Sequence, residues 1–211
     1  INILMIVPWI IIGGADIFNL ELIKRLDKNK YTFTLISTEP AINNLRQKIE
    51  NIADVYDITS FIECKDYISF IKYIMEKNNI NMIFNTSSFF GYSILPYLKG
   101  MYPQIPIVDY IHMEEWYNRN GGYARSSSML EGIIDKTLVC NSVTEEILVN
   151  YFKRKDNEVE TVYIGVDTEK FNPDKYDKMQ LRKKYGLENN NKIIIGYICR
   201  ISEQKRPMLL A

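Results

Sequence analysis

Residues 3–26 read ILMIVPWIIIGGADIFNLELIKRL, which is a short apolar run, a glycine pair and a helical pattern in that order. Residues 3–7 are continuously apolar, as in a parallel strand that is covered on both faces. After Gly13 and Gly14, apolar residues recur on one stripe of a helix: Ala15, Phe18, Leu22 and Leu26. A strand that turns through glycines into a helix is typical of a βαβ unit, so this stretch predicts an α/β fold.

The same alternation of apolar runs and helical patterns continues as far as residue 164. The further strands are expected at residues 31–37, 54–58, 82–84, 106–111, 136–140 and 161–164. The further helices are expected at residues 66–77, 92–100 and 142–152. Ser142 and Glu145 have the spacing of a capping box at the start of the last helix. Strands and helices in alternation predict a doubly wound parallel sheet, which is Rossmann-like.

The composition changes after residue 164. Residues 165–191 are rich in charged residues and hold one helical pattern, and residues 193–198 then begin a new apolar run, IIIGYI. We therefore expect a first domain over residues 1–170 and a linker with a short helix over 171–191. Residues 192–211 are expected to be the first strand and helix start of a second domain. The chain is thus expected to be a piece of a longer protein.

The overall composition narrows the classes of function. The 211 residues include 26 basic and 26 acidic side chains, which argues against nucleic acid as a partner because such proteins carry a basic excess. Three cysteines and one histidine show no metal-ligand spacing, so we expect free thiols, no metal and no cofactor. The apolar run 3–12 is far shorter than the about 20 residues that cross a bilayer.

Two places in the first domain have residue types that suit a ligand. Gly13 and Gly14 let the backbone approach an anion at the start of a helix, although a tight turn would need glycines too. His112 follows a predicted strand and can hydrogen-bond to a sugar hydroxyl or to developing charge, although a lone histidine is more often structural. The loop after it combines aromatic rings with polar groups, which suits a sugar, or packs back on the domain: Trp116, Tyr117, Asn118, Arg119 and Tyr123.

Three motifs, one of which contains Gly13 and Gly14, carry a resemblance to a known family. Residues 161–173 read TVYIGVDTEKFNP, and residues 195–207 read IGYICRISEQKRP. The pair resembles the interdomain segment and the start of the second domain in family 4 (group 1) glycosyltransferases. Residues 13–16, GGAD, resemble that family's G-G-A-E turn. The sequence departs from the pattern at Ile164, where the family has Asn, and at Cys199 and Arg206, where it has Gly.

This resemblance implies the N-terminal half of a GT-B fold, in which two Rossmann-like domains face each other. It implies a retaining, metal-independent transfer of sugar from a nucleotide diphosphate sugar to an acceptor hydroxyl, in the synthesis of cell-surface polysaccharide or glycoconjugate. The acceptor would be a sugar or a lipid-linked sugar, and the latter would bring a cytoplasmic enzyme to the inner face of the membrane. The present chain alone is expected to be inactive.

The resemblance also assigns roles to residues. Arg200 and Lys205 would bind the donor phosphates together with Gly13 and Gly14, since an arginine fork and a lysine suit a pyrophosphate. Without the resemblance, two cations at this place would more often be solvated residues of an exposed loop. His112 would act at the reaction centre, and the five loop residues named above would bind the acceptor. The alternatives are a nucleotide-sugar epimerase of the same fold and a non-catalytic module that binds a sugar or nucleotide.

Overall fold

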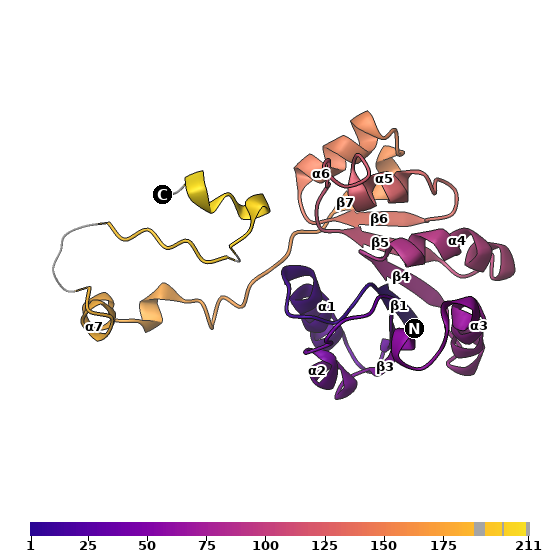
Figure 1. Cartoon of the computed structure of the whole chain (residues 1–211), viewed down its shortest axis with the longest axis horizontal. Helices are drawn as coiled ribbons and strands as arrows, with labels where there is room; N and C mark the ends of the chain where they lie inside the picture. The colour runs from indigo at the N-terminus through magenta and orange to yellow at the C-terminus, as the bar shows by residue number, and fades with distance from the viewer. Residues whose placement is uncertain (188–192, 200, 210–211) are drawn as a thin grey trace. The chain divides into compact units, whose positions relative to one another are not determined.

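The computed structural model describes residues 1–187, 193–199 and 201–209. The chain forms two compact units, Ile1–Ile164 and Gly165–Ala211, which are described separately below. The first unit holds a seven-stranded sheet in the order β3-β2-β1-β4-β5-β6-β7, with every neighbouring pair parallel (Figure 1). The strands are β1 Asn2–Val7, β2 Thr32–Ser37, β3 Asp54–Asp57, β4 Met82–Thr86, β5 Ile107–Ile111, β6 Lys136–Val139 and β7 Val159–Thr161. The prediction of a doubly wound, Rossmann-like sheet is confirmed.

Helices cover both faces of this sheet (Figure 1). On one face, α1 (Gly14–Arg25) and α2 (Arg46–Glu50) pack on the strands, and on the other α3 (Tyr67–Lys77) and α4 (Phe89–Met101) do so. Three further helical segments of the unit lie near β5, β6 and β7: α5 Gly122–Ser128, α6 Ser142–Glu146 and a π-helical turn Ile147–Tyr151. Each crossover therefore buries one apolar stripe against the sheet.

Strand β1 shows why the opening run is continuously apolar. Leu4 and Ile6 pack in the core beneath α3 and α4, whereas Ile3, Met5 and Val7 pack in the core beneath α1 and α2. All five side chains are buried. Successive side chains of a strand point to opposite faces, so a strand with helices on both sides leaves no position for a polar residue.

Two local predictions in the first unit are wrong. Helix α6 is capped by Asn141, whose Oδ1 accepts from the Thr144 N–H at 2.9 Å, and not by Ser142. The Glu145 carboxylate accepts a hydrogen bond from the Thr161 hydroxyl on β7 instead of reaching back to the helix start. Strand β7 begins at Val159 and ends at Thr161, so the apolar residues Tyr163 and Ile164 lie beyond it and are exposed.

The second unit contains one α-helix among its described residues, α7 (Lys178–Lys184), whose N-cap is Asp177. The described residues 193–199 form no strand, because none of the described segments donates or accepts a ladder of hydrogen bonds beside them. Their assignment to a second domain stays a prediction. In the described parts of the chain, no helix has the length and apolar character needed to span a bilayer.

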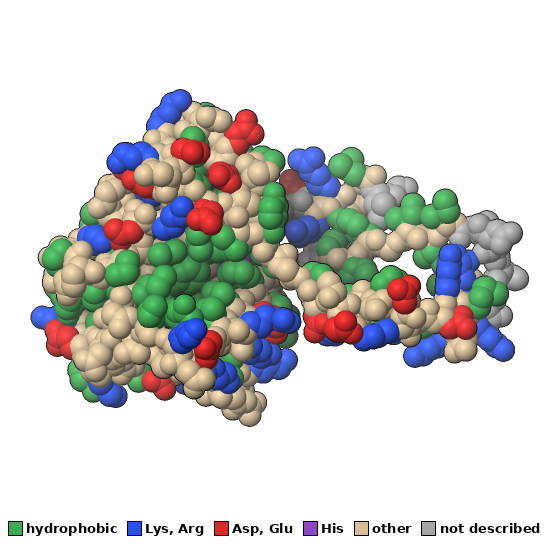
Figure 2. All heavy atoms as spheres, turned by 180° about the vertical axis from the view of Figure 1, so that it is seen from behind, with side chains coloured by type: hydrophobic (Ala, Val, Ile, Leu, Met, Phe, Trp, Pro, Cys, Tyr) green, Lys and Arg blue, Asp and Glu red, His purple; other side chains and the backbone are tan. Residues whose placement is uncertain are grey.

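The surface of the first unit is uneven in polarity. Figure 2 shows hydrophobic side chains gathered in one broad area of this unit, with charged side chains around it. Contiguous apolar areas with a polar border are typical of places where a protein meets a ligand or a partner.

Candidate functional site

The strand order reverses between β1 and β4, which are neighbours in the sheet although two strands separate them in sequence. The chain leaves β1 for α1 on one face and leaves β4 for α4 on the other. Segments that diverge in this way open a crevice at the carboxyl ends of the strands, where ligands of open α/β sheets bind. The candidate site is therefore the group of side chains that follows β1, β4 and β5.

A set of hydroxyl groups ties the ends of the strands together at this point. The Thr38 hydroxyl, just after β2, lies 2.9 Å from the Ser88 hydroxyl, just after β4. The Ser88 Oγ also accepts from the Gly91 N–H at 2.9 Å, which caps α4. Both serine and threonine are buried, so these bonds fix the loops on either side of the switch point.

Gly13 and Gly14 lie where the sequence predicts, at the start of α1. Gly13 is the N-cap residue, and no side chain among the described residues caps this twelve-residue helix. A Cβ on Gly13 would lie 2.8 Å from the Asp16 carboxylate, whereas around Gly14 the described residues leave at least 4 Å free. The Asp16 carboxylate takes the N–H group of its own residue in this first turn, so an anion would meet the first N–H groups of the helix that remain.

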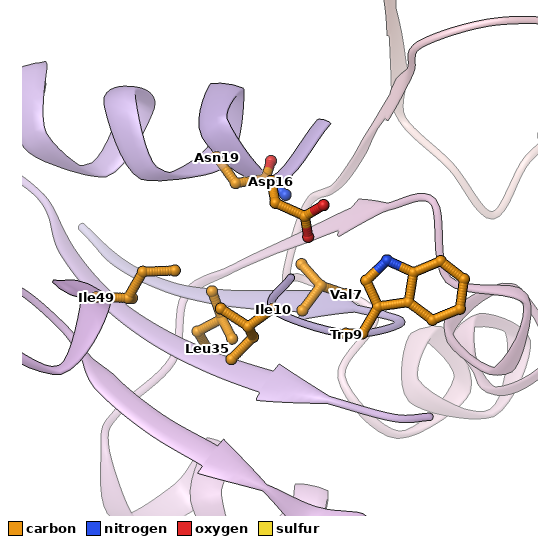
Figure 3. A pocket seen from close by; sticks show the side chains of 7 residues that line it. All are labelled: Val7, Trp9, Ile10, Asp16, Asn19, Leu35 and Ile49. Atoms are coloured by element: carbon orange, nitrogen blue, oxygen red, sulfur yellow. The ribbon is translucent and has the colours of Figure 1, made fainter. Parts of the chain in front are cut away.

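Asp16 faces a hollow beneath the first turns of α1. The hollow is lined by Val7, Trp9, Ile10, Asp16, Asn19, Leu35 and Ile49. Figure 3 shows the Asp16 carboxylate pointing from α1 toward Val7 and Trp9. Burial raises the pKa of the Asp16 carboxyl to about 6, even though backbone N–H groups of Asp16 and Ile11 act in the opposite direction.

His112 follows β5 directly, as the sequence predicts. Its ring lies edge-on to Phe18 of α1, with 5.3 Å between the centroids, and its Nε2 lies 3.5 Å from the Thr86 hydroxyl at the end of β4. The Cys140 thiol donates to the His112 carbonyl at 2.8 Å. Burial lowers the pKa of the imidazole to about 4, so the ring is neutral at pH 7 and can donate or accept a hydrogen bond.

The five loop residues of the predicted acceptor site fall into two groups. Trp116 stacks on Phe152, with 5.7 Å between centroids and 13° between planes. Tyr117 and Asn118 both donate to the Glu115 carboxylate, at 3.2 Å and 2.8 Å. In this first group, Trp116 and Tyr117 are exposed and Asn118 is half-buried.

Arg119 and Tyr123 form the second group, and both contact Phe89 at the start of α4. The Arg119 guanidinium lies 4.1 Å from the centroid of the Phe89 ring, and the Tyr123 ring stacks on it at 4.4 Å. Burial raises the pKa of the Tyr123 phenol further above its usual range, and the nearby carboxylates Glu115 and Glu39 add to the effect. Tyr123 therefore stays protonated as a hydrogen-bond donor.

The two predicted phosphate ligands lie in the second unit. Arg200 is outside the described residues. Lys205 is exposed and ends a single helical turn, Glu203–Lys205. Arg206, which stands where the resembling pattern has glycine, has φ +50°, in the left-handed region that favours glycine. Arg206 thus adopts a backbone conformation that a glycine at this position would reach without strain.

Several residues around His112 could not be identified from the sequence. Phe18 lies on the predicted apolar stripe of α1, and Thr86 is the last residue of β4. Both reach His112 from elements far away in sequence, so their proximity depends on the strand order. Groups of three or more side chains that could hold a metal ion are absent from the described part of the chain.

The chain is similar to known proteins both in its family and in its fold. The model of Glycosyltransferase Family 4 matches residues 12–170. A glycosyltransferase from Rickettsia africae ESF-5 has a similar structure, with a TM-score of 0.66, 19% identity and coverage of 90% of this chain and 50% of that chain. Anabaena HepE in complex with UDP matches with a TM-score of 0.64 and 14% identity, over 90% of this chain and 51% of the other.

A further similar structure belongs to another class of enzyme. The UDP-GlcNAc 2-epimerase from Neisseria meningitidis, bound to UDP-GlcNAc, matches with a TM-score of 0.54 and 13% identity, over 88% of this chain and 54% of that chain. No curated protein has significant sequence similarity to the chain. The chain spans about half the length of the solved structures that it matches. At these identities the structures establish the N-terminal half of a GT-B fold.

Proposed function

The chain belongs to glycosyltransferase family 4, and from this membership we propose that the whole protein transfers a sugar from a nucleotide diphosphate sugar to an acceptor hydroxyl with retention of configuration. We place the product in cell-surface polysaccharide or glycoconjugate synthesis. The reaction would take place in the cytoplasm, at the inner face of the membrane when the acceptor is lipid-linked.

The position of His112 is the observation that carries this proposal. The histidine follows β5 and contacts Phe18, which lies one turn into the helix that begins at Gly14. A neutral imidazole at the carboxyl end of a strand can donate to a sugar hydroxyl next to the reacting carbon. Gly13 and Gly14 would hold a phosphate through the first N–H groups of α1. We propose Arg200 and Lys205 as further ligands of the diphosphate.

The chemistry of retention asks little of the protein beyond positioning. The acceptor hydroxyl would attack the anomeric carbon from the face that the nucleoside diphosphate leaves, and the leaving phosphate oxygen would take the hydroxyl proton. No metal is needed in this step, because cationic side chains and helix N–H groups stabilise the departing charge. Trp116, Tyr117, Asn118, Arg119 and Tyr123 would border the acceptor.

UDP is the first nucleotide to test. HepE and the Neisseria epimerase were both solved with a uridine nucleotide, and both share this fold. In the full-length protein, Arg200→Ala and Lys205→Ala should each weaken UDP binding by about 1.5–3 kcal/mol, the range for hydrogen bonds to charged groups. The exposed Lys183→Ala on α7 is the matched control. Calorimetry that finds the same affinity in all three variants would refute the phosphate role.

Product analysis separates transfer from epimerisation. Incubation of the full-length protein with a UDP-sugar and acceptor should give a glycoside whose anomeric configuration, read by NMR, equals that of the donor. An epimerase would instead return a UDP-sugar with one stereocentre changed, and a binding module would return the donor unchanged. The same measurement on the present chain should show no turnover, since electrostatic groups of the second domain are expected to supply most of the stabilisation.

A further inference from the structure

Two segments far apart in sequence form an exposed aromatic cluster, which we call the aromatic platform: Trp116, Tyr151 and Phe152. Trp116 stacks on Phe152 and meets Tyr151 edge-on at 5.1 Å, and Tyr151 meets Phe152 edge-on at 5.0 Å. The Trp116 and Tyr151 side chains are 44% and 64% exposed. Single exposed aromatic rings are common, but three in mutual contact at the surface are typical of a place where a ligand or partner binds.

The platform is fixed at its base, because Phe152 is half-buried against the core. Phe152 packs against the core cluster that contains Ile111 and Leu148. Its ring lies directly over Gly121, where an added Cβ would approach the Phe152 Cζ to 2.5 Å. Gly121 also has φ +125°, a conformation that favours glycine. A side chain at this position would therefore be strained and would also collide with the Phe152 ring. The loop that carries Trp116 is thereby fixed against the segment that carries Tyr151.

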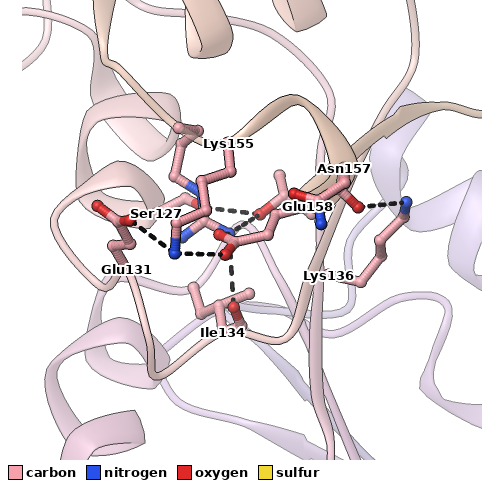
Figure 4. A network of polar contacts seen from close by, with 9 residues as sticks. Ser127, Glu131, Ile134, Lys136, Lys155, Asn157 and Glu158 are labelled. Carbon is pink, nitrogen blue, oxygen red and sulfur yellow. Dashed lines mark hydrogen bonds and ion pairs between the residues drawn. The ribbon is translucent and has the colours of Figure 1, made fainter.

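A network of charged groups holds the chain immediately after the platform (Figure 4). The Arg154 side chain is buried and its Nη2 lies 3.2 Å from the Glu158 carboxylate. Lys155 pairs with Glu131 at 3.1 Å and with Glu158 at 3.2 Å. These contacts tie residues 154–158 to the segment after α5, so the rings of the platform are held in place before any ligand arrives. Such preorganisation lowers the cost of binding.

The groups beside the platform are polar and of mixed charge, with Glu115 on one segment and the exposed Lys153 directly after Phe152 on the other. The Glu115 carboxylate accepts from Tyr117 and Asn118, and the Tyr117 ring is 73% exposed. Arg119 is turned to Phe89 on the other side of the loop. Platforms that stack nucleic-acid bases are combined with a positively charged groove. A sugar ring fits this surface better. Its C–H groups can stack on the negative face of the Trp116 indole, and its hydroxyls can hydrogen-bond to the carboxylate, phenol and amide of the neighbouring loop residues.

The distance to the reaction centre then determines which part of the ligand lies here. Trp116 is four residues after His112, so their Cα atoms are at most about 14 Å apart. This bound places the platform within the reach of an acceptor that has more than one sugar unit and whose reacting hydroxyl lies at His112. We propose that the acceptor is an oligosaccharide and that the aromatic platform binds one of its non-reacting sugar units. The inference rests on the proposed function and adds Tyr151 and Phe152 to the acceptor site.

The two tryptophans of the chain, Trp9 and Trp116, give a direct test. In a Trp9→Phe background of the full-length protein, Trp116 is the reporter, and its fluorescence is followed while malto-, cello- and chito-oligosaccharides are added, from monosaccharide to hexasaccharide. At least one series should change the Trp116 emission, with affinity rising from the monosaccharide to the longer chains. Tyr151→Ala should weaken that binding by about tenfold. Emission that no oligosaccharide alters would overturn the proposal.

The matched control is Tyr73→Ala, which removes a tyrosine that is 53% exposed on α3, outside the platform. Equal oligosaccharide affinity in Tyr151→Ala and Tyr73→Ala would refute the platform, provided that both variants keep the circular dichroism spectrum of the parent. UDP binding is measured in the same samples. Loss of oligosaccharide binding with intact UDP binding in Tyr151→Ala supports the platform, whereas a parent that binds oligosaccharide and no nucleotide contradicts the proposed function alone.

Discussion

The imidazole ring of His112 lies edge-on to the phenyl ring of Phe18, with 5.3 Å between the centroids and 80° between the planes. Phe18 is on α1 and His112 follows β5, so this contact joins the helix of the glycine pair to the far side of the switch point. It also covers the imidazole, and burial is the cause of its lowered pKa. This contact therefore contributes both to the position of the proposed reactive histidine and, together with the Tyr110 ring at 4.8 Å, to the burial that keeps it neutral.

The first prediction concerns the titration of His112. Its pKa of about 4 in the folded protein lies below the usual value of 6.5, so folding favours the neutral ring. The resulting contribution to the free energy of unfolding is complete above pH of about 6.5 and is lost as the pH falls toward 4, by at most about 3 kcal/mol. Because the chain has one histidine, its NMR ring resonances are assigned without ambiguity.

Urea unfolding between pH of about 4 and 7 provides the second measurement. His112→Gln cannot gain a proton in this range, so the difference in stability between parent and variant should shrink as the pH falls. Ring resonances that titrate near 6.5, or a difference that is independent of pH, would show that His112 is not desolvated.

The second prediction concerns Asp16, whose pKa is raised to about 6. Since the folded value exceeds the unfolded one, the ionised carboxylate destabilises the fold, and this effect is absent below pH of about 4 and complete above about 6. Asp16→Asn should therefore raise the free energy of unfolding by about 1–2 kcal/mol at pH 7 and much less at pH 4. The exposed Asp27→Asn, just after α1, is the control and should change little at either pH.

The strands were predictable because a parallel strand with helices on both faces needs a continuous apolar run, as residues 3–7 show. The residues at which helices and strands begin and end were harder to predict from the sequence. Asn141 and Ser142 are both good N-cap residues, and only the backbone path decides that Asn141 accepts from Thr144. In the site, the rule that ligands lie at strand ends identified His112, whereas its contacts with Phe18 and Thr86 depend on the order β1-β4-β5. The stack of Trp116 on Phe152 is non-local in the same way.

The third prediction compares two glycines of α4. A Cβ on Gly91 would lie 2.0 Å from the Oδ1 of Asn85 and 3.2 Å from the Cγ2 of Ile6, and both of these side chains are fully buried. Gly91→Ala should therefore lower the free energy of unfolding by about 2–3 kcal/mol. Gly100→Ala is the matched control, because the described residues leave at least 4 Å around its Cβ position, and it should raise stability by about 0.5–1 kcal/mol. Thermal unfolding of both variants measures the contrast, and equal midpoints would contradict the packing.

The last prediction concerns the buried hydrogen bond between Tyr92 and Asp109. The Tyr92 hydroxyl donates to the Asp109 Oδ2 at 2.8 Å, and the Thr137 and Ser127 hydroxyls also lie near this buried carboxyl. Burial raises the pKa of Asp109, while hydrogen bonds from Thr137, Ser127 and Tyr92 and the nearby charge of Arg154 favour its ionised form. Tyr92→Phe should lower the free energy of unfolding by about 1–3 kcal/mol at pH 7, because the carboxyl loses a donor that water cannot replace.

The pH dependence of this loss and a second tyrosine of α4 test the cause. Removal of the hydroxyl raises the pKa of Asp109 further, so the cost should be smaller at low pH, where the carboxyl is protonated with or without Tyr92. Tyr97→Phe removes the same atom from a side chain that is 50% exposed on the same helix, and it should change stability by less than about 0.5 kcal/mol. The measurement is urea unfolding of the parent and the two variants, at pH 7 and at a low pH where the Asp109 carboxyl is protonated. A loss in Tyr92→Phe that is independent of pH would mean that the hydroxyl stabilises the fold by packing and not through the carboxylate.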